Sequence, residues 1–127
     1  MKYEKIDGKT VIGLIEPVVI AGKAEKRIMM AKIDTGASKS SIDVNLASHL
    51  KLGPIIKSKL IKSASGNRVR PVLELDIELA GKKFKEEFTL ADRWHMKYRV
   101  LIGQNILQHG YLIDPSKKMV QNPGTGF

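Results

Sequence analysis

The stretch Ile33-Asp34-Thr35-Gly36-Ala37-Ser38 decides the fold of this chain, and it directly follows the apolar run 27–31. A short acid therefore stands on a glycine turn, at the end of a strand that is predicted to be buried. A carboxylate in such a place is costly unless it has a function. Gly36 permits close backbone approach and dihedral angles closed to other residues.

A second segment, Val100-Leu101-Ile102-Gly103-Gln104-Asn105-Ile106-Leu107, lies where a partner for this turn is expected. The alternative is an ordinary exit from a strand into a turn, because Asp and Gly are common turn residues. An isolated Asp-Thr-Gly triplet is weak support for a functional loop. The apolar residues before it and the Leu-Ile-Gly segment downstream favour one.

Composition limits the class of protein. The 127 residues predict a single domain over 1–127, with a tail that becomes loose from about residue 116, and the hydrophobic content of 43% suits a globular core. The absence of cysteine excludes disulfides, thiol catalysis and cysteine-ligated zinc. Since no apolar run approaches membrane-spanning length and residues 1–5 lack the apolar core of a signal peptide, we expect a cytoplasmic protein without membrane contact.

The charge is strongly basic, with 22 Lys and Arg against 13 Asp and Glu, and a net charge of +9. Three interpretations are open: an acidic peptide substrate, nucleic acid, or a lysine-rich surface without a ligand. The lysines are scattered along the chain, and an aromatic content of 6% offers few platforms for base stacking. Nucleic acid is therefore the least favoured partner.

Short β segments separated by turn signals predict an all-β sandwich or barrel. Pro17 suggests that the first strand is an edge strand or contains a bulge. Residues 63–68 are predicted to form the tip of a hairpin. The expected strands are 10–20, 27–33, 40–44, 55–61, 69–79, 84–90 and 100–102, with short helices at 45–50, capped by Asn45, and at 104–108.

The order of these parts resembles the retropepsin-like aspartic proteases, whose fold is a closed all-β barrel with one short C-terminal helix as its substantial helix. Within that class the chain is similar to a bacterial and archaeal group that is found beside ATP-grasp glutamate ligases and often labelled ATP-dependent zinc proteases. The resemblance covers roughly residues 11–120. The shared stretches are 31–37, 69–72, 88–98, 100–104 and 112–116.

The resemblance implies a catalytic pair made by Asp34 from each of two subunits, braced by Thr35 and Gly36. Two such carboxylates share one proton, because like charges about 3 Å apart cannot both ionise. The chain contains one Asp-Thr-Gly, so this interpretation requires a homodimer. The hairpin would close over the substrate as a flap. The expected substrate-binding residues are Ala37, Ser38, Ser65, Gly66, Asn67, Arg68 and Arg70.

The glutamate-ligase link implies cleavage of glutamate-containing peptides or tails, and an association with an ATP-grasp ligase. The chain departs from the group at Ser38 and at Gln104, where the group usually has arginine, so its specificity can differ. We expect no metal, because the three histidines are far apart and none lies in His-Glu-x-x-His. No cofactor is expected, and any ATP dependence would belong to a partner.

Several alternatives remain open at this point. Arg68 and Arg70 can bind substrate carboxylates or be solvated. Arg93 can pair with Asp92 and steer the chain toward Gly103, or line the substrate groove. Ser38 and Ser40 can hydrogen-bond Asp34 or simply form turns. At the level of function, the alternatives to a peptidase are a catalytically inactive module that binds an acidic tail for a ligase, and a basic nucleic-acid-binding barrel.

Overall fold

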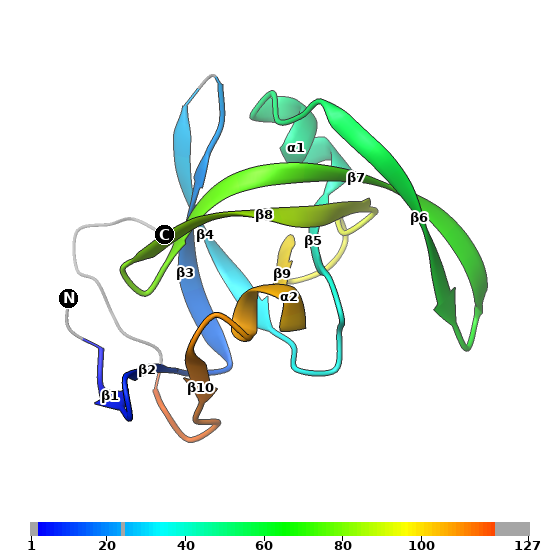
Figure 1. Ribbon diagram of the computed structural model, residues 1–127. Coiled ribbons are helices and arrows are strands. Elements are labelled where there is room, and N and C mark those ends of the chain that lie inside the picture. Colours follow the sequence, from blue (N-terminus) through cyan, green and yellow to red (C-terminus); the bar gives the residue numbers. More distant parts are fainter. Residues whose placement is uncertain (1–2, 24, 119–127) are drawn as a thin grey trace.

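The computed structural model describes residues 3–23 and 25–118. It consists mainly of strands, with two short helices (Figure 1). In chain order the elements are β1 (Lys5–Ile6), β2 (Lys9–Ile12), β3 (Ile15–Ala21), β4 (Lys26–Ile33), β5 (Ser40–Asp43), α1 (Val44–His49), β6 (Ile55–Ser63), β7 (Gly66–Leu79), β8 (Lys82–Ala91), β9 (Val100–Ile102), α2 (Gln104–Leu107) and β10 (Tyr111–Ile113).

The main sheet closes on itself into a barrel. Its strand order is β3-β4-β9-β5-β8-β7, and a further pairing between β3 and β7 completes the six-stranded ring. Two of the contacts are parallel, β4 with β9 and β5 with β8, so strands from distant parts of the chain lie side by side. The predicted all-β closed barrel is confirmed.

A small second sheet joins the beginning and the end of the described chain. Its order is β1-β2-β10, with β1 antiparallel and β10 parallel to β2. The sequence carries no signal for β1. The single strand predicted over 10–20 is divided at Gly13 and Leu14 into β2 and β3. The buried Glu16 fixes this break, because its carboxylate accepts the Gly13 N–H at 2.7 Å.

Pro17 lies in β3, which pairs with β4 along its length but with β7 only from Val18 onward, so the strand is an edge at Pro17 and not beyond it. It sits opposite Met30 of β4, while the pairing of β3 with β7 begins one residue later, at Val18. Proline has no N–H to offer a second neighbour. The position of Pro17 just outside the β7 ladder accommodates that loss.

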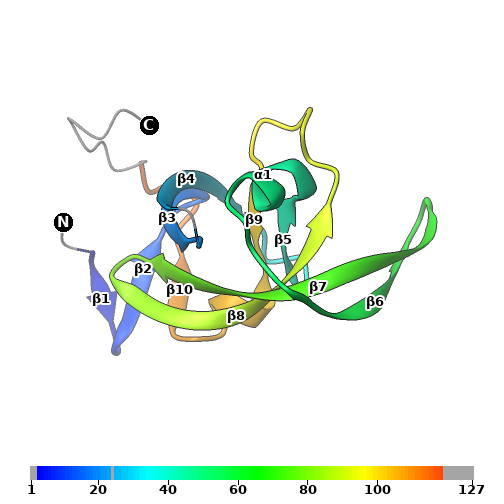
Figure 2. The same ribbon diagram turned by 90° about the horizontal axis from the view of Figure 1, so that it is seen from above.

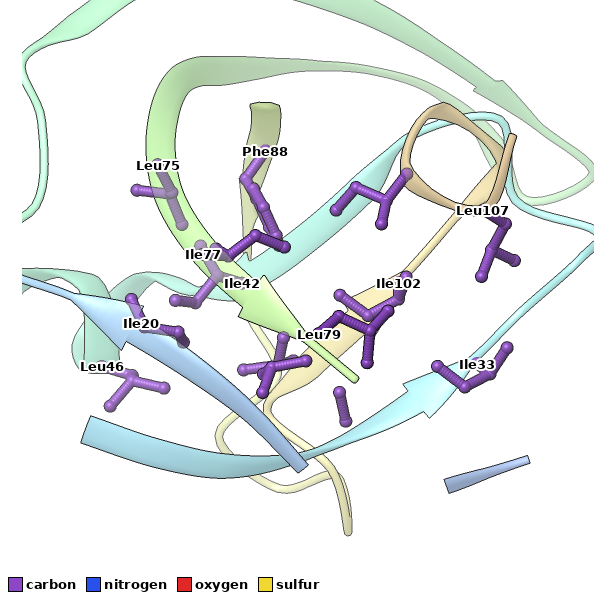
Figure 3. Close-up of a cluster of buried hydrophobic side chains, with 14 of the residues drawn as sticks. Ile20, Ile33, Ile42, Leu46, Leu75, Ile77, Leu79, Phe88, Ile102 and Leu107 are labelled. Carbon is purple, nitrogen blue, oxygen red and sulfur yellow. The ribbon is translucent and has the colours of Figure 1, made fainter. Parts of the chain in front are cut away.

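The core is made mainly of branched aliphatic side chains, together with two alanines, Phe88 and Tyr111 (Figure 3). Inward-facing positions alternate along the strands, as the burial of Val18 and Ile20 on β3 illustrates. Ile33 and Ile102 of the parallel pair β4 and β9 are both buried, directly before the two glycine segments. This packing fixes the place at which the two segments leave the barrel.

The two helices differ from expectation in their caps and lengths. Asp43, not Asn45, caps α1: its Oδ2 accepts the N–H groups of Asn45 and Leu46, both at 3.1 Å. The segment after Gly103, expected to be the substantial helix, is the four-residue α2, which is shorter than the six-residue α1. Neither helix, within the described residues, is long and apolar enough to cross a membrane.

The predicted hairpin is formed by β6 and β7, and it projects away from the barrel in both views (Figures 1 and 2). Its tip is tighter than expected, because Ser63 pairs with Gly66 and only two residues connect them. Leu60 and Val69 face each other across the hairpin, and their side chains are exposed to 50% and 68%. The outer hairpin therefore presents apolar side chains to its surroundings.

Candidate active site

Backbone hydrogen bonds of the loop after β4 fix the position of Asp34. The Asp34 N–H donates to the Ile102 carbonyl at 2.9 Å, which ties the loop to β9. One carboxylate oxygen, Oδ1, accepts the Gly36 N–H at 2.9 Å, and the Ala37 N–H donates to the Asp34 carbonyl at 3.3 Å. The side chain is partly exposed, so a carboxylate of fixed orientation is available to a molecule outside the barrel.

The structure brings the two glycine segments together, as the sequence analysis expected of a partner segment. The side-chain amide of Gln104 donates to the Thr35 carbonyl at 2.6 Å. The Gln104 N–H donates to the Ala37 carbonyl at 2.8 Å, and the Asn105 N–H to the Ser38 carbonyl at 3.2 Å. Gln104, a departure from the group pattern, thus supports the loop that carries Asp34.

Gly103 is the point of closest contact between the two segments. A Cβ at this position would lie 2.6 Å from the Lys39 carbonyl oxygen and 2.8 Å from that of Ala37. These are backbone atoms, which cannot swing aside. Position 103 must therefore be glycine, because any larger residue would overlap the backbone of the Asp34 loop.

A buried amide network supports the loop from the other side. Asn105 Oδ1 accepts both the N–H of Ser40, at 2.9 Å, and its hydroxyl, at 2.8 Å. Asn105 Nδ2 donates to the Glu87 carbonyl at 2.9 Å and to Glu86 Oε1 at 3.3 Å. In addition, the Gly103 N–H donates to Ser40 Oγ at 3.0 Å. One amide therefore connects β5, β8 and the start of α2.

This network corrects one hypothesis about Asp34. The Ser40 hydroxyl donates to Asn105 and not to Asp34, so the expected contact is wrong for Ser40. Within the described ranges, no hydrogen bond joins the Ser38 side chain to Asp34 either. Sequence reasoning did not single out Asn105. The available signal was a polar residue inside the apolar segment 100–107.

Replacing the amide is expected to destabilise the protein. Asn105→Ala leaves the buried N–H and hydroxyl of Ser40 without their acceptor, which we expect to lower the free energy of unfolding by about 2–4 kcal/mol. Urea unfolding would measure the change in the free energy of unfolding. Asn45→Ala, the same change at an exposed position, is the matched control and should cost less than about 1 kcal/mol. Equal losses in the two variants would contradict a role for the network.

Glu86 gives this region a pH-dependent contact. Partial burial raises its pKa, but hydrogen bonds from His109, the Glu87 N–H and Asn105 outweigh that effect and leave the pKa below its usual value of 4.5. The His109 ring nitrogen lies 2.7 Å from Glu86 Oε2. Because the pKa is lower in the folded state, this stabilisation is present above the unfolded-state pKa and is lost as the pH falls through the folded-state pKa.

We therefore expect Glu86→Gln to destabilise the protein at pH 7 and to have a shrinking effect as the pH falls below about 4.5. Denaturant unfolding of both proteins between pH 3 and 7 would measure the difference. Glu74→Gln, at an exposed position on β7, should show no such trend. A destabilisation by Glu86→Gln that stays constant down to pH 3 would contradict the assigned cause.

The loop between β8 and β9 does not contain the expected ion pair. Within residues 3–23 and 25–118, no ion pair joins Arg93 to Asp92. Instead, the Arg93 N–H donates to Asp43 Oδ1 at 2.8 Å, and the Arg93 Nε donates to the Tyr98 carbonyl at 3.1 Å. Arg99, rather than Arg93, stacks on Trp94, with 4.1 Å from its guanidinium carbon to the ring centre.

The hairpin residues expected to bind substrate lie along β7, where Asn67 and Arg68 pair with Lys62 and Ile61. Ser65 belongs to the turn, and Gly66 begins β7. In the part of the chain that the structure describes, no hydrogen bond or ion pair joins Asn67, Arg68 or Arg70 to the Asp34 loop. The structure therefore gathers residues 34–38 with Gln104.

Among residues 3–23 and 25–118, no group of three His, Asp or Glu side chains lies close enough together to hold a metal ion.

The sequence model of one protein family matches residues 45–124, and its description is "Retropepsin-like aspartic endopeptidase RimB". The chain belongs to this RimB-like family. The match includes Gly103 and α2 and begins after the Asp34 loop.

Relatives of the RimB-like chain include proteins named "Probable alpha-L-glutamate ligase". The one from Desulfotalea psychrophila is 29% identical over 111 residues, covering 68% of this chain and 24% of the relative. The one from Shewanella pealeana is 34% identical over 64 residues, covering 50% of this chain and 14% of the relative. The chain thus spans a quarter or less of the length of these relatives.

Two solved structures share the fold of the RimB-like chain. Lpg0085 of Legionella pneumophila, a protein of unknown function, has a TM-score of 0.60 and 22% identity, over 87% of this chain and 96% of that one. The simian foamy virus protease has a TM-score of 0.53 and 21% identity, over 74% of this chain and 91% of the protease. The retropepsin-like fold predicted from the sequence is confirmed.

Proposed function

We propose that this RimB-like protein is a homodimeric aspartic peptidase that hydrolyses peptide or glutamyl amide bonds. The observation that carries the proposal is the fixed orientation of the Asp34 carboxylate, whose Oδ1 accepts the Gly36 N–H while its loop is held by Ile102 and Gln104. A catalytic acid needs such preorganisation. Because Asp-Thr-Gly occurs once in the sequence, the second carboxylate comes from a second copy.

In the proposed reaction the two Asp34 side chains share one proton. The ionised carboxylate takes a proton from water as the water oxygen attacks the scissile carbonyl carbon, and the protonated carboxyl donates its proton to the carbonyl oxygen. When the tetrahedral intermediate collapses, the C–N bond breaks and the leaving nitrogen receives a proton from the first carboxyl, while one hydroxyl of the intermediate returns its proton to the second carboxylate. The products are a carboxylic acid and an amine.

The charge and the relatives favour an acidic substrate. A net charge of +9 attracts an acidic peptide and speeds its encounter with the protein. The ligase names of the relatives favour glutamate-containing chains as the substrate and a ligase as a partner. The exposed Leu60 and Val69 offer apolar contacts to a peptide beneath the hairpin.

The experiment that tests this proposal combines sedimentation with hydrolysis. We expect the sedimenting mass to rise from one to two subunits with concentration, and the hydrolysis rate per subunit on glutamate-tailed peptides to rise in parallel. Mass spectrometry of the products locates the bond. A peptide with an alanine tail is the control. Activity per subunit that is already maximal in a strict monomer would contradict the shared pair of carboxylates.

The second candidate function is a catalytically inactive module that binds an acidic tail for a ligase. The names of the relatives favour it, because the matching segment is a small part of proteins named as ligases. This function needs neither a dimer nor paired Asp34 side chains. A strict monomer that binds glutamate-tailed peptides without cleaving them would support it and exclude the peptidase.

A further inference from the structure

The hairpin of β6 and β7 leaves the barrel at a place where it has little support. β7 pairs with β8 only from Val72 onward, so residues 58–71, the outer hairpin, have no other strand beside them in the part of the chain that the structure describes. The pairing of β6 with β7 shifts register between Ile55 and Lys57, which interrupts the ladder at the base of the hairpin. Interruptions of this kind bend a strand and weaken its pairing locally. We therefore expect the outer hairpin to pivot at its base.

The hairpin carries positive charge only. Residues 55–71 include three lysines and two arginines and no acid. Among the residues that the structure describes, one ion pair joins this hairpin to the barrel, and it lies between Lys57 Nζ and Glu87 Oε2 at 2.9 Å. Lys57 stands directly beyond the interruption in β6. A contact at this position restrains the whole outer hairpin, because every residue farther out moves with it.

The other oxygen of Glu87 is bound on the barrel side. Lys39, the last residue before β5 in the loop that follows β4, donates from its Nζ to Glu87 Oε1 at 3.1 Å. The main chain of Lys39 packs against Gly103, where a Cβ would lie 2.6 Å from the Lys39 carbonyl oxygen. The main chain of Glu87 is held as well, because its carbonyl accepts Asn105 Nδ2 at 2.9 Å. Glu87 is therefore a fixed anchor, and Lys57 is its link to the hairpin.

The three charged groups depend on one another. Hydrogen bonds from Lys57 and from Lys39 lower the pKa of Glu87 below its usual value of 4.5, so its carboxylate is charged at neutral pH. Without this charge, the two ammonium groups that flank the carboxylate would repel each other. The Lys57 side chain is 53% exposed, whereas those of Lys39 and Glu87 are exposed to 28% and 22%. The link to the hairpin is thus the more solvated of the two contacts and the one more sensitive to salt.

We propose that Glu87 is a positioning residue that sets the angle of the hairpin relative to the Asp34 loop. One carboxylate holds both parts, through Lys57 at the base of the hairpin and Lys39 at the end of the loop, and we call these three residues the Glu87 clamp. In its effect on hydrolysis the inference rests on the proposed function. A hairpin that is already oriented loses less conformational freedom when it closes over a peptide. The Glu87 clamp therefore acts on substrate binding and not on proton transfer at Asp34.

The orientation of the hairpin is measured without any substrate. The chain has no cysteine, so Ala64→Cys in the hairpin turn and Ser48→Cys on α1, both at exposed positions, give two unique sites for nitroxide spin labels. The labelled protein is mixed with excess unlabelled protein, so that each distance measured by pulsed electron spin resonance lies within one subunit. We expect a narrow distance distribution when the Glu87 clamp is intact, and one about twice as wide or more in Glu87→Gln.

Matched variants separate the Glu87 clamp from a general change of charge. Glu74→Gln removes an acid from the β7 position that pairs with Glu87 and should leave the width unchanged. Lys57→Met should widen the distribution as Glu87→Gln does, whereas Lys62→Met removes the same charge nearer the tip of the same strand and should not. Salt at about 1 M, which shortens the screening length to about 3 Å, should widen the distribution of the unchanged clamp but not that of Glu87→Gln.

The width of the distribution decides the proposal. It is overturned if Glu87→Gln and Glu74→Gln give equally wide distributions, or if Lys57→Met behaves like Lys62→Met. Lys57→Met also decides the matter if Glu87→Gln fails to fold, which a thermal melt would reveal, because Lys57 is exposed and its replacement leaves the barrel contacts of Glu87 intact.

Hydrolysis by the same variants, without spin labels, is measured separately. Relative to Glu74→Gln, which has the same net charge, we expect Glu87→Gln to raise KM about 2- to 5-fold and to leave kcat within about twofold, as the loss of one surface ion pair predicts. A fall in kcat with KM unchanged would contradict a role in binding. If the distribution widens in a protein that cleaves nothing, the Glu87 clamp stands and the peptidase fails. If the protein cleaves peptides but the distribution does not respond to Glu87→Gln, the peptidase stands and the clamp is overturned.

Discussion

Asp34→Asn is expected to lower kcat for hydrolysis by at least about a thousandfold, because asparagine can neither share the proton nor take one from water. The fold should survive the change. The amide oxygen of asparagine can replace Oδ1 as the acceptor of the Gly36 N–H, and the backbone bond to Ile102 is unaffected. Hydrolysis rates, melting temperature and sedimenting mass of the purified variant would test all three expectations.

The matched control is Asp7→Asn. Asp7 is exposed, and its backbone has a φ of 52°, a left-handed conformation that asparagine also adopts readily. This variant should retain full activity. If Asp34→Asn kept more than about a tenth of the wild-type rate while Asp7→Asn behaved normally, Asp34 would not be the acid that activates water.

Gly103→Ala adds a single methyl group to the site. Among such additions at this site, we expect it to lower the free energy of unfolding the most. The new Cβ would lie 2.6 Å from the Lys39 carbonyl oxygen, far inside ordinary contact, and both segments are fixed by backbone hydrogen bonds. We expect the free energy of unfolding to fall by about 3 kcal/mol or more. The melting temperature should fall by about 10 °C.

Gly8→Ala is the comparison for this change. Gly8 has a φ of +78°, but a Cβ there meets no atom within 4 Å, so only backbone strain of about 1 kcal/mol is expected. Urea unfolding of both variants compares the cost of backbone strain, from Gly8→Ala, with the cost of steric overlap, from Gly103→Ala. A Gly103→Ala protein as stable as Gly8→Ala would mean that the Asp34 loop can move away from α2 at little cost.

The parts of the site that the sequence predicted are those encoded by local chemistry. An acid on a glycine turn after an apolar strand, and a second glycine after Val100-Leu101-Ile102, mark the two segments that the structure brings together. The alternation of apolar residues along β7 likewise predicted that strand. Turn residues and strand periodicity act over a few positions, and a single sequence therefore reveals them.

The features that the sequence did not predict depend on partners far away in the chain. The sequence offers Ser40 either Asp34 or a simple turn, whereas its partner in the structure, Asn105, is 65 residues away. The sequence offers Arg93 either the adjacent Asp92 or the substrate groove, whereas its backbone N–H donates to Asp43, 50 residues earlier. The break of the first strand at Gly13 depends on the buried Glu16, and composition alone does not report on burial.

The wide separation of the two glycine segments has a consequence for the protein during its synthesis. Thr35 and Gln104 are 69 residues apart, and the hydrogen bond between them is among those that hold the Asp34 loop. Pairings of such long range form late in folding. A ribosome that has made the first glycine segment must still translate most of the barrel before this loop can be held. The nascent chain therefore exposes no ordered half-site, and any proteolytic activity would arise only after its own barrel has closed.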